Sequence, residues 1–499
     1  MLQLLTSSQT READAHTIKN KPISSLDLME SASNAFIYAF KQDVPTIDSL
    51  ISVYCGTGNN GGDGLAIARL LKENAYDRIS VKIARFSAKE SADFSANLER
   101  LKLTGIPITE ITNTDVFPEE NAEVIIDALI GSGLNKALQG DLKSLVIHLN
   151  QLQKKVIAVD IPTGLPSEGP IDPDACILKA SLCVCFQRPK INFFFPESAK
   201  ALERFKVVEI GLDEQFIQSQ AGPWKYIEEK DIRYSIKPRK AFSHKGTYGH
   251  ALIIAGYTET MGAALLCADA CLHSGAGLTT ACIPENGYSA LNSFAPEVMI
   301  LPRSELILGK SLEKYSSIAI GPGLGTDKEA TDLLEYVLNF NKARIVIDAD
   351  AINILAANTE LLTKLPKDCI ICPHVKEFDR LFGKSNSWWD RVTLALKKAK
   401  EFNLIILLKN QYTFIVTPDG DILINPTGNP GMAVGGMGDI LTGMIASFLA
   451  QSYPAIEAAM LAAYIHGAAG DQLIQMNSIP PRYITEQIPA LIKRFTAPD

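Results

Sequence analysis

Short apolar runs alternate with amphipathic, helix-like stretches along most of the chain. In the first half, the runs at 50–54, 124–126 and 156–159 each end at a glycine-rich or acidic loop. Helical patterns lie between them, as at 64–74 and 141–151. Strands that alternate with helices predict a parallel sheet, and the loops after parallel strands gather at one edge, where open α/β folds bind ligands.

The same pattern returns in the second half, after a polar and turn-rich stretch at 215–243. Its strand-like runs are 250–255, 317–320, 344–347, 369–372 and 404–408. No repeat of fixed period relates the two halves, and 499 residues exceed the usual size of a single core. The sequence therefore predicts an α/β protein of two different domains, over 1–220 and 226–499, with a linker near 218–226.

Composition excludes several classes of protein. The 46% hydrophobic and 21% charged residues are typical of globular proteins, and no apolar run reaches the roughly 20 residues that span a membrane. A net charge of −8 disfavours a nucleic-acid surface. The start of the chain lacks a secretory signal pattern, so we expect a cytoplasmic protein without a membrane partner. Small-molecule ligands and a homo-oligomer are expected instead.

The nine cysteines predict reduced thiols. Cys369 and Cys372 have CxxC spacing, but they lie in an apolar run without a second ligand pair. Buried core positions are therefore favoured over a zinc or redox site.

The most informative segment is the glycine-rich stretch 433–439, which runs into the apolar segment 440–450. Glycines let backbone N–H groups converge, and a helix N-terminus attracts phosphate. Asp439 follows directly, where a proton acceptor would face that phosphate. A helix cap alone would leave the preceding glycines without a purpose. A different glycine loop at 55–64 lies far upstream, so the chain is expected to carry two active sites.

Asp127 and Asp160 each follow an apolar run in the first half. A role as a helix N-cap readily explains one aspartate after an apolar run. It explains two such aspartates beside glycine loops less readily. Asn60 and Asp127 could hold a cation through oxygen atoms, which would leave Asp160 free for proton transfer.

In the second half, His374 and Lys409 lie at the ends of predicted strands. The alternative for His374 is a core histidine whose ring nitrogens are hydrogen-bonded within the protein. The alternative for Lys409 is a lysine whose ammonium group extends to solvent. The proline between glycines at 321–325 suggests a shaped pocket wall.

Three motifs of the first half, Gly58–Gly64, Asp127–Gly133 and Val159–Gly164, resemble the NAD(P)HX epimerase family over about residues 1–215. The resemblance implies a Rossmann-like domain that interconverts the R and S forms of hydrated NADH and NADPH. It also implies a potassium ion at Asn60, Asp127 and Thr163. The implied dinucleotide contacts are Asn60, Gly61, Gly62, Asp63, Gly64, Gly131, Ser132, Gly133, Leu134, Asn135, Lys136, Ala137 and Asp160.

The second half resembles the ribokinase-like superfamily and, within it, the ADP- or ATP-dependent NAD(P)HX dehydratases, over about residues 230–495. The most specific motifs are His244–Gly249, Gly321–Gly323, Asn425–Met432 and the glycine loop with Asp439. The implied substrate contacts are Ala263, Gly323, His374 and Asp439. The implied nucleotide contacts are Lys409, Asn410, Gln411, Tyr412, Thr413 and Gly438. Lys376 and Asn410 replace glycines of the family, which leaves the shapes of two loops open.

The two halves together predict a bifunctional repair enzyme acting on NADHX and NADPHX. One site would epimerise them, and the other would dehydrate the S epimer with ADP and magnesium, giving AMP and phosphate. Asp439 would take the proton of the C6 hydroxyl as a phosphoryl group moves to that oxygen. One alternative is an ATP-dependent kinase of a vitamin precursor or sugar, but the motif at 244–249 and the fused first domain disfavour it. Another is a catalytically idle nucleotide sensor, which the presence of Asp160 and Asp439 disfavours.

Overall fold

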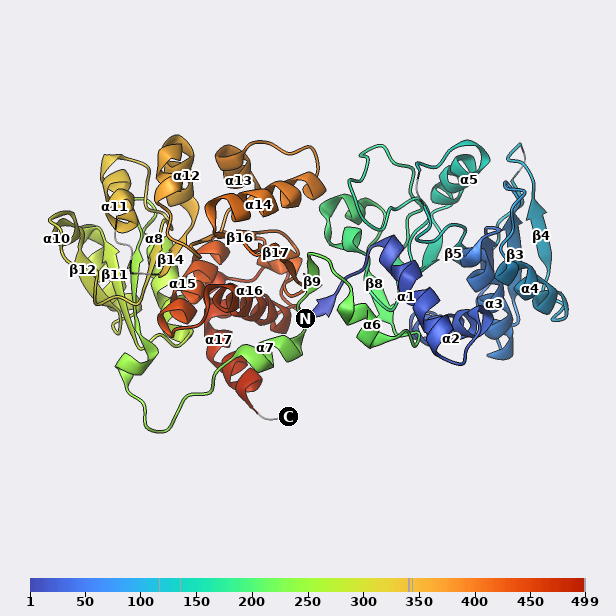
Figure 1. Ribbon diagram of the computed structural model, residues 1–499, viewed down its shortest axis with the longest axis horizontal. Coiled ribbons are helices and arrows are strands. Elements are labelled where there is room, and N and C mark those ends of the chain that lie inside the picture. The colour runs from blue at the N-terminus through green and yellow to red at the C-terminus, as the bar shows by residue number, and fades with distance from the viewer. Residues whose placement is uncertain (116, 135, 340–341, 343, 498–499) are drawn as a thin grey trace. The chain divides into compact units, whose positions relative to one another are not determined.

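The computed structural model describes residues 1–115, 117–134, 136–339, 342 and 344–497. It consists of two compact units (Figure 1). The N-terminal unit contains Gln3–Gly222 and Ser387–Trp389. The C-terminal unit contains Met1–Leu2, Pro223–Asn386 and the chain from Asp390 onward. The division between Gly222 and Pro223 falls inside the segment where the linker is predicted.

A seven-stranded parallel sheet forms the centre of the N-terminal unit, in the order β4-β3-β2-β5-β6-β7-β8. The chain order reverses between β2 and β5, which creates the crevice where doubly wound folds bind dinucleotides. The strands are β2 (Ile51–Cys55), β3 (Ile79–Ala84), β4 (Ile108–Ile111), β5 (Val124–Ala128), β6 (Lys155–Val159), β7 (Leu182–Phe186) and β8 (Phe205–Val208).

Helices pack on both faces of this sheet. Successive side chains of a strand point to opposite faces of the sheet. In β2, the neighbouring residues Val53 and Tyr54 are both buried and belong to separate apolar clusters, so both faces of the sheet are covered. The helices are α1 (Ser7–Asn20), α2 (Ser25–Asp43), α3 (Asn59–Glu73), α4 (Ala92–Lys102), α5 (Gly140–Gln151), η1 (Ile191–Phe194), η2 (Pro196–Lys200) and α6 (Glu214–Ser219).

The C-terminal unit is built on an 11-stranded mixed sheet, in the order β1-β9-β18-β17-β16-β15-β14-β13-β10-β11-β12. Strands from β16 to β12 in this order are parallel, and β17 is antiparallel to both of its neighbours. The strands are β1 (Leu2–Gln3), β9 (Trp224–Tyr226), β10 (His250–Ile254), β11 (Leu278–Ile283), β12 (Met299–Pro302), β13 (Ser317–Ile320), β14 (Arg344–Ile347), β15 (Ile370–Ile371), β16 (Ile405–Leu408), β17 (Thr413–Val416) and β18 (Ile422–Asn425).

Helix α15 is almost wholly buried and packs on α8. Their close approach needs a glycine, because a Cβ on Gly443 would overlap the carbonyl oxygen of Cys267. The helices are α7 (Glu229–Ser235), η3 (Lys245–Tyr248), α8 (Met261–His273), η4 (Glu285–Gly287), α9 (Tyr288–Phe294), α10 (Arg303–Ile307), α11 (Lys328–Leu338), α12 (Ala349–Ala357), η5 (Thr359–Lys364), α13 (Val375–Phe382), α14 (Trp388–Phe402), η6 (Pro430–Met432), α15 (Met437–Ala450), α16 (Ala455–Gln472) and α17 (Pro481–Thr496).

The strand runs predicted at 317–320 and 344–347 coincide with β13 and β14. Two glycine segments differ from the prediction, because α3 already begins at Asn59 and α15 at Met437. The polar stretch also contains α6, β9 and α7. Hydrogen bonds to strand β18 organise β9 there, which local composition does not reveal.

Among the described residues, no helix is long and apolar enough to cross a bilayer. All nine cysteines are free, and both Cys369 and Cys372 are buried in the core as expected.

Candidate active sites

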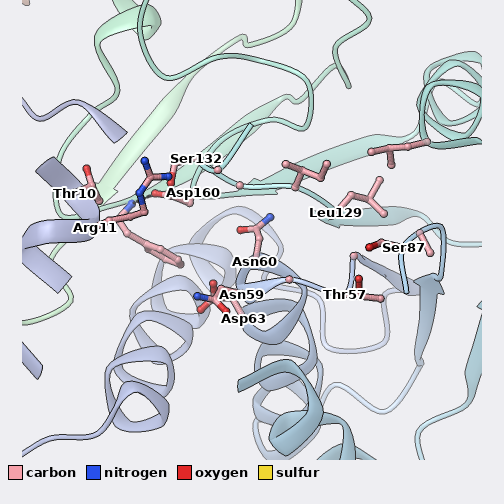
Figure 2. Close-up of a pocket in the computed structure, with 18 of the residues that line it drawn as sticks. Thr10, Arg11, Thr57, Asn59, Asn60, Asp63, Ser87, Leu129, Ser132 and Asp160 are labelled. Carbon is pink, nitrogen blue, oxygen red and sulfur yellow. Dashed lines mark hydrogen bonds between the residues drawn. The ribbon is translucent and has the colours of Figure 1, made fainter. Parts of the chain in front are cut away.

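A cavity of about 990 Å³ lies at the carboxyl ends of β2, β5 and β6 in the N-terminal unit. Figure 2 shows Asn60, Asp63 and Asp160 among the side chains that line it. The predicted site residues in its wall are Asn60, Asp63, Gly131, Ser132, Gly133 and Asp160. Helix α1 adds Thr10, Arg11 and Asp14, which strand-end reasoning missed because they precede the first strand of this sheet.

Other predicted residues lie behind or beside the wall. Gly61 and Gly64 are buried in the first turns of α3, where close packing requires them. A Cβ on Gly61 would overlap the carbonyl oxygen of Gly56, and one on Gly64 would come within 2.8 Å of Cys55 Sγ. Gly62 is also buried in α3. The cavity wall does not include Leu134, Lys136 or Ala137. Asn135 lies outside the described residues.

Asp127 and Thr163 are in direct contact. Both Asp127 oxygens accept bonds from Thr163, at 2.7 Å from its hydroxyl and 2.8 Å from its backbone N–H. Asp127 is fully buried, and burial raises the pKa of its carboxyl to about 6, against the lowering effect of the Thr163 hydrogen bonds. The carboxylate therefore ties the end of β5 to the loop after β6.

Asn60 has a buried amide nitrogen without a hydrogen-bond partner among the described residues. A Cβ added to Gly131 would lie 3.0 Å from Asn60 Oδ1, so the two glycine loops meet at this side chain. An unpartnered buried amide beside a cavity is a feature that a ligand can satisfy.

In the C-terminal unit, a cavity of about 530 Å³ lies between the β16–β17 turn, the loop after β18, the start of α15 and helix α16. The predicted residues in its wall are His374, Lys409, Asn410, Gln411, Thr413 and Gly438. Tyr412, Ala263, Gly323 and Asp439 are not part of this wall. Ala263 and Gly323 lie together elsewhere, because a Cβ on Gly323 would be 3.0 Å from Ala263 Cβ.

The glycine loop opens α15 with a left-handed residue. Gly436 has φ of 99°, a conformation that residues with a side chain rarely adopt, and it serves as the N-cap of the helix. Asp439 lies in the first turn of α15. This first turn also carries backbone N–H groups without a partner inside the helix, which can bind an anion.

Lys409 is a half-buried lysine in an ion pair with a buried carboxylate, rather than a lysine that extends to solvent. Its Nζ lies 2.8 Å from Oδ1 of Asp348, whose other oxygen accepts a 2.7 Å bond from Thr442. Asp348 is 1% exposed and was missed as a site residue. Its position directly after β14 could have indicated a functional role, because His374 and Lys409 follow β15 and β16 of the same sheet.

Asp439 titrates in an unusual environment. Burial first, and the Asp348 charge second, raise the pKa of its carboxyl to about 7, while Lys409 opposes the shift. A carboxylate with such a pKa can accept a proton near neutral pH.

His374 caps helix α13. Its Nδ1 accepts from the backbone N–H groups of Lys376 and Glu377, and its Nε2 lies 3.3 Å from a Glu377 oxygen. The histidine therefore has a structural task in addition to its place in the cavity wall. Neither Lys376 nor Asn410 has a positive φ, so the backbone at these two positions does not require glycine.

His466 of α16 also lines the cavity and was missed. Its Nε2 is buried without a partner among the described residues, and burial first and Lys409 second lower its pKa to about 4. The ring is therefore neutral at physiological pH. Its signal in the sequence was weak, because it lies in the middle of a helix of small apolar residues.

Comparison with known proteins resolves the family. Residues 25–192 match the family described as YjeF-related protein N-terminus, and residues 251–490 match NAD(P)H-hydrate dehydratase. A Moorella thermoacetica protein named bifunctional NAD(P)H-hydrate repair enzyme is 32% identical, over 94% of this chain and 92% of its own. The chain belongs to the bifunctional NAD(P)H-hydrate repair enzyme family.

A Coxiella burnetii member of this repair enzyme family is 32% identical over 98% of this chain and 99% of its own. Among solved structures, a ribokinase-like superfamily protein of Enterococcus faecalis has a TM-score of 0.52 and 30% identity, covering 56% of this chain and 99% of its own. An ADP/ATP-dependent NAD(P)H-hydrate dehydratase of Bacillus subtilis, co-crystallised with ATP and Mg²⁺, has a TM-score of 0.50 and 31% identity, covering 54% and 98%. The predicted fold class, α/β with a ribokinase-like second half, is thereby confirmed.

Proposed function

We propose that this chain repairs hydrated nicotinamide nucleotides in two steps. The N-terminal unit interconverts R- and S-NAD(P)HX, and the C-terminal unit dehydrates the S epimer to NAD(P)H with ADP, which yields AMP and phosphate. Relatives that match almost the full length support this assignment. They also disfavour the kinase and sensor alternatives, since relatives matching both halves carry the repair-enzyme name.

The single observation that carries the dehydratase step is the placement of Asp439. Its carboxyl, with pKa of about 7, shares the first turn of α15 with backbone N–H groups that bind anions. We assign Asp439 as the base that takes the proton of the C6 hydroxyl while the terminal phosphoryl group of ADP moves to that oxygen. The first-turn amides and Lys409 stabilise the charge on the moving group. Phosphate then departs from C6 as the ring nitrogen donates its lone pair, and loss of a proton from C5 restores the C5–C6 double bond of NAD(P)H.

The cavity around Gly438 and Lys409 is assigned to ADP, and the neighbouring Ala263 and Gly323, with His374, to the hydrated nicotinamide. Among the described residues, no group of three or more His, Cys, Asp or Glu side chains forms a metal site. Magnesium would therefore be held mainly by the phosphate oxygens of the nucleotide, which is its usual mode in such enzymes.

In the N-terminal unit, the cavity is assigned to the dinucleotide and Asp160 to proton transfer. Two of the three predicted potassium residues, Asp127 and Thr163, are in contact, and Oδ1 of the third, Asn60, lies against Gly131 of the neighbouring loop. Amide and carboxylate oxygens suit a large monovalent cation, so the oxygens of Asn60 and Asp127 are the ligands that fit the ion. A bound potassium ion would supply positive charge that orders the loop carrying the dinucleotide.

One assay tests the whole proposal. Purified protein is incubated with a mixture of NADHX epimers, with and without ADP, and NADH is followed by its absorbance while the epimers are separated by chromatography. We expect full conversion of both epimers with ADP, and epimerisation alone without it. Conversion of only half the mixture would remove the epimerase assignment, and no NADH in either arm would remove the dehydratase assignment.

A further inference from the structure

The ends of two neighbouring strands bring Asp160 into contact with a lysine. Asp160 directly follows β6, and Lys190 lies in the turn after β7, which pairs with β6 in parallel. Lys190 Nζ is 2.6 Å from Asp160 Oδ1, and both residues line the large cavity of the N-terminal unit. An ammonium group and a carboxylate thus meet inside the site itself.

Both charges are buried. Lys190 is 4% exposed and Asp160 is 9% exposed. Burial lowers the pKa of the Lys190 ammonium, but the Asp160 carboxylate, together with Cys185 and Cys183, reverses this effect and the pKa is raised. Buried ions are tolerated when they are paired, so each group depends on the other.

The backbone around this pair is in a rare conformation. Asp160 has φ of 64° and Gln187, in the turn that leads to Lys190, has φ of 58°. Left-handed non-glycine residues carry strain that persists only where the surroundings enforce it, and such residues concentrate at functional sites. Both outliers belong to the segments that carry the ion pair.

The two oxygens of Asp160 have different surroundings. Oδ1 accepts from Lys190 and, at 3.0 Å, from the backbone N–H of Phe186. Oδ2 receives no hydrogen bond from the residues that the structure describes. Since Asp160 lines the cavity, Oδ2 is the oxygen available to a ligand.

The acidic groups around Asp160 have raised pKa values. Burial first and Asp160 second raise the pKa of Asp14 to about 6, and the Asp63 pKa is raised well above its usual value for the same two reasons. The titratable groups that interact electrostatically with Asp160 are Asp14 of α1, Asp63 of α3, Cys183 and Cys185 of β7, and Lys190 in the turn after β7. Lys190 is the cation of this set.

We propose that Lys190 is a positioning residue for epimerisation: it holds Oδ1 of Asp160, so that Oδ2 faces the cavity and can take a proton from the hydrated ring. This inference rests on the epimerase function proposed for the N-terminal unit. In the transfer, the substrate O–H bond breaks and an Oδ2–H bond forms, while the electron pair left on oxygen makes a C6=O double bond and the N1–C6 bond breaks with its pair on N1. N1 then closes on the other face of C6, the C6=O pair returns to oxygen and takes the proton back from Oδ2, and Lys190 keeps its own protons throughout.

The test measures kcat and KM for R-to-S interconversion by the full-length protein. For Lys190→Gln we expect kcat to fall about 100-fold and KM to change less than about threefold, because Lys190 acts by holding the Asp160 carboxylate. Lys190→Arg keeps a cation at this position and should retain a kcat within about fivefold of wild type. Lys102→Gln, on the exposed surface of α4, is the matched control.

Dehydration of the S epimer by the same chain serves as an internal measure of intact protein. A kcat of Lys190→Gln within threefold of wild type, or a loss that appears in KM and not in kcat, would overturn the proposal. If Lys190→Gln does not fold, Lys190→Arg decides: a kcat near wild type supports the role of the cation, and a 100-fold loss in a folded Lys190→Arg protein refutes it. Absence of epimerisation in the wild-type protein would instead remove the function on which the inference rests.

Discussion

The Nζ atom of Lys409 lies 2.8 Å from Oδ1 of Asp348, at the ends of two strands of the C-terminal sheet. A Cβ added to Gly438 would be 3.3 Å from that Nζ and 3.7 Å from Asp348 Oδ2, so the pair lies against the glycine loop. Asp348 therefore has two tasks. It holds the lysine in place, and its negative charge helps to raise the pKa of Asp439.

Replacing Asp439 by asparagine should remove nucleotide-dependent repair and keep the shape of the site. General-base removal costs on the order of 10² to 10⁴ in rate, whereas nucleotide affinity should change only a few-fold. Formation of NADH from S-NADHX and ADP measures the rate, and calorimetric titration with ADP measures binding. A variant that keeps more than half the wild-type rate would show that Asp439 is not the base.

The dehydratase rate should depend on pH through Asp439. A base must be deprotonated to accept a proton, so with a pKa of about 7 the rate should rise as pH passes upward through about 7. Asp348→Asn removes the charge that raises this pKa, and the rise should move to lower pH. Asp332→Asn, exposed on α11, should leave it in place. Identical pH profiles of wild type and Asp348→Asn would contradict the coupling.

Exchange of potassium for lithium should slow epimerisation and leave dehydration of the S epimer unchanged, because the cation residues belong to the N-terminal unit. Asn60→Ala should mimic the exchange, and it is a cleaner test than Asp127→Ala, since Asp127 also holds Thr163. Chromatography of the two epimers at matched ionic strength gives the rates. Equal rates in both salts would reduce Asp127 to a structural residue.

Separate fragments should each fold and keep one activity, because each unit has its own core. The structure moves the start of the second fragment from the predicted 226 to Pro223, since β9 belongs to the C-terminal sheet and Trp224 is 6% exposed. Starting at Tyr226 loses this buried side chain and should cost about 3 kcal/mol in the free energy of unfolding. Urea titrations of the two fragments measure the difference. Fragments of equal stability would show that β9 is dispensable.

The sequence by itself determined the alternation of strands and helices, and with it the edge of each sheet where function lies. Asp160, His374 and Lys409 could be found in this way, because an apolar run followed by a polar residue marks a strand end whatever the rest of the chain does. The boundaries of α3 and α15 could not, since glycines that permit a loop also permit the tight helix packing seen at Gly61 and Gly443.

Only the tertiary structure decided which side chains are partners. Lys190 pairs with Asp160 at the ends of the adjacent strands β7 and β6, and Lys409 pairs with Asp348 at the ends of β16 and β14, which have β15 between them. Local patterns report burial and backbone preference, but charges act through space. The pKa of Asp439 and the ion pairs in both cavities therefore depend on how the strands are ordered, which the sequence pattern does not specify.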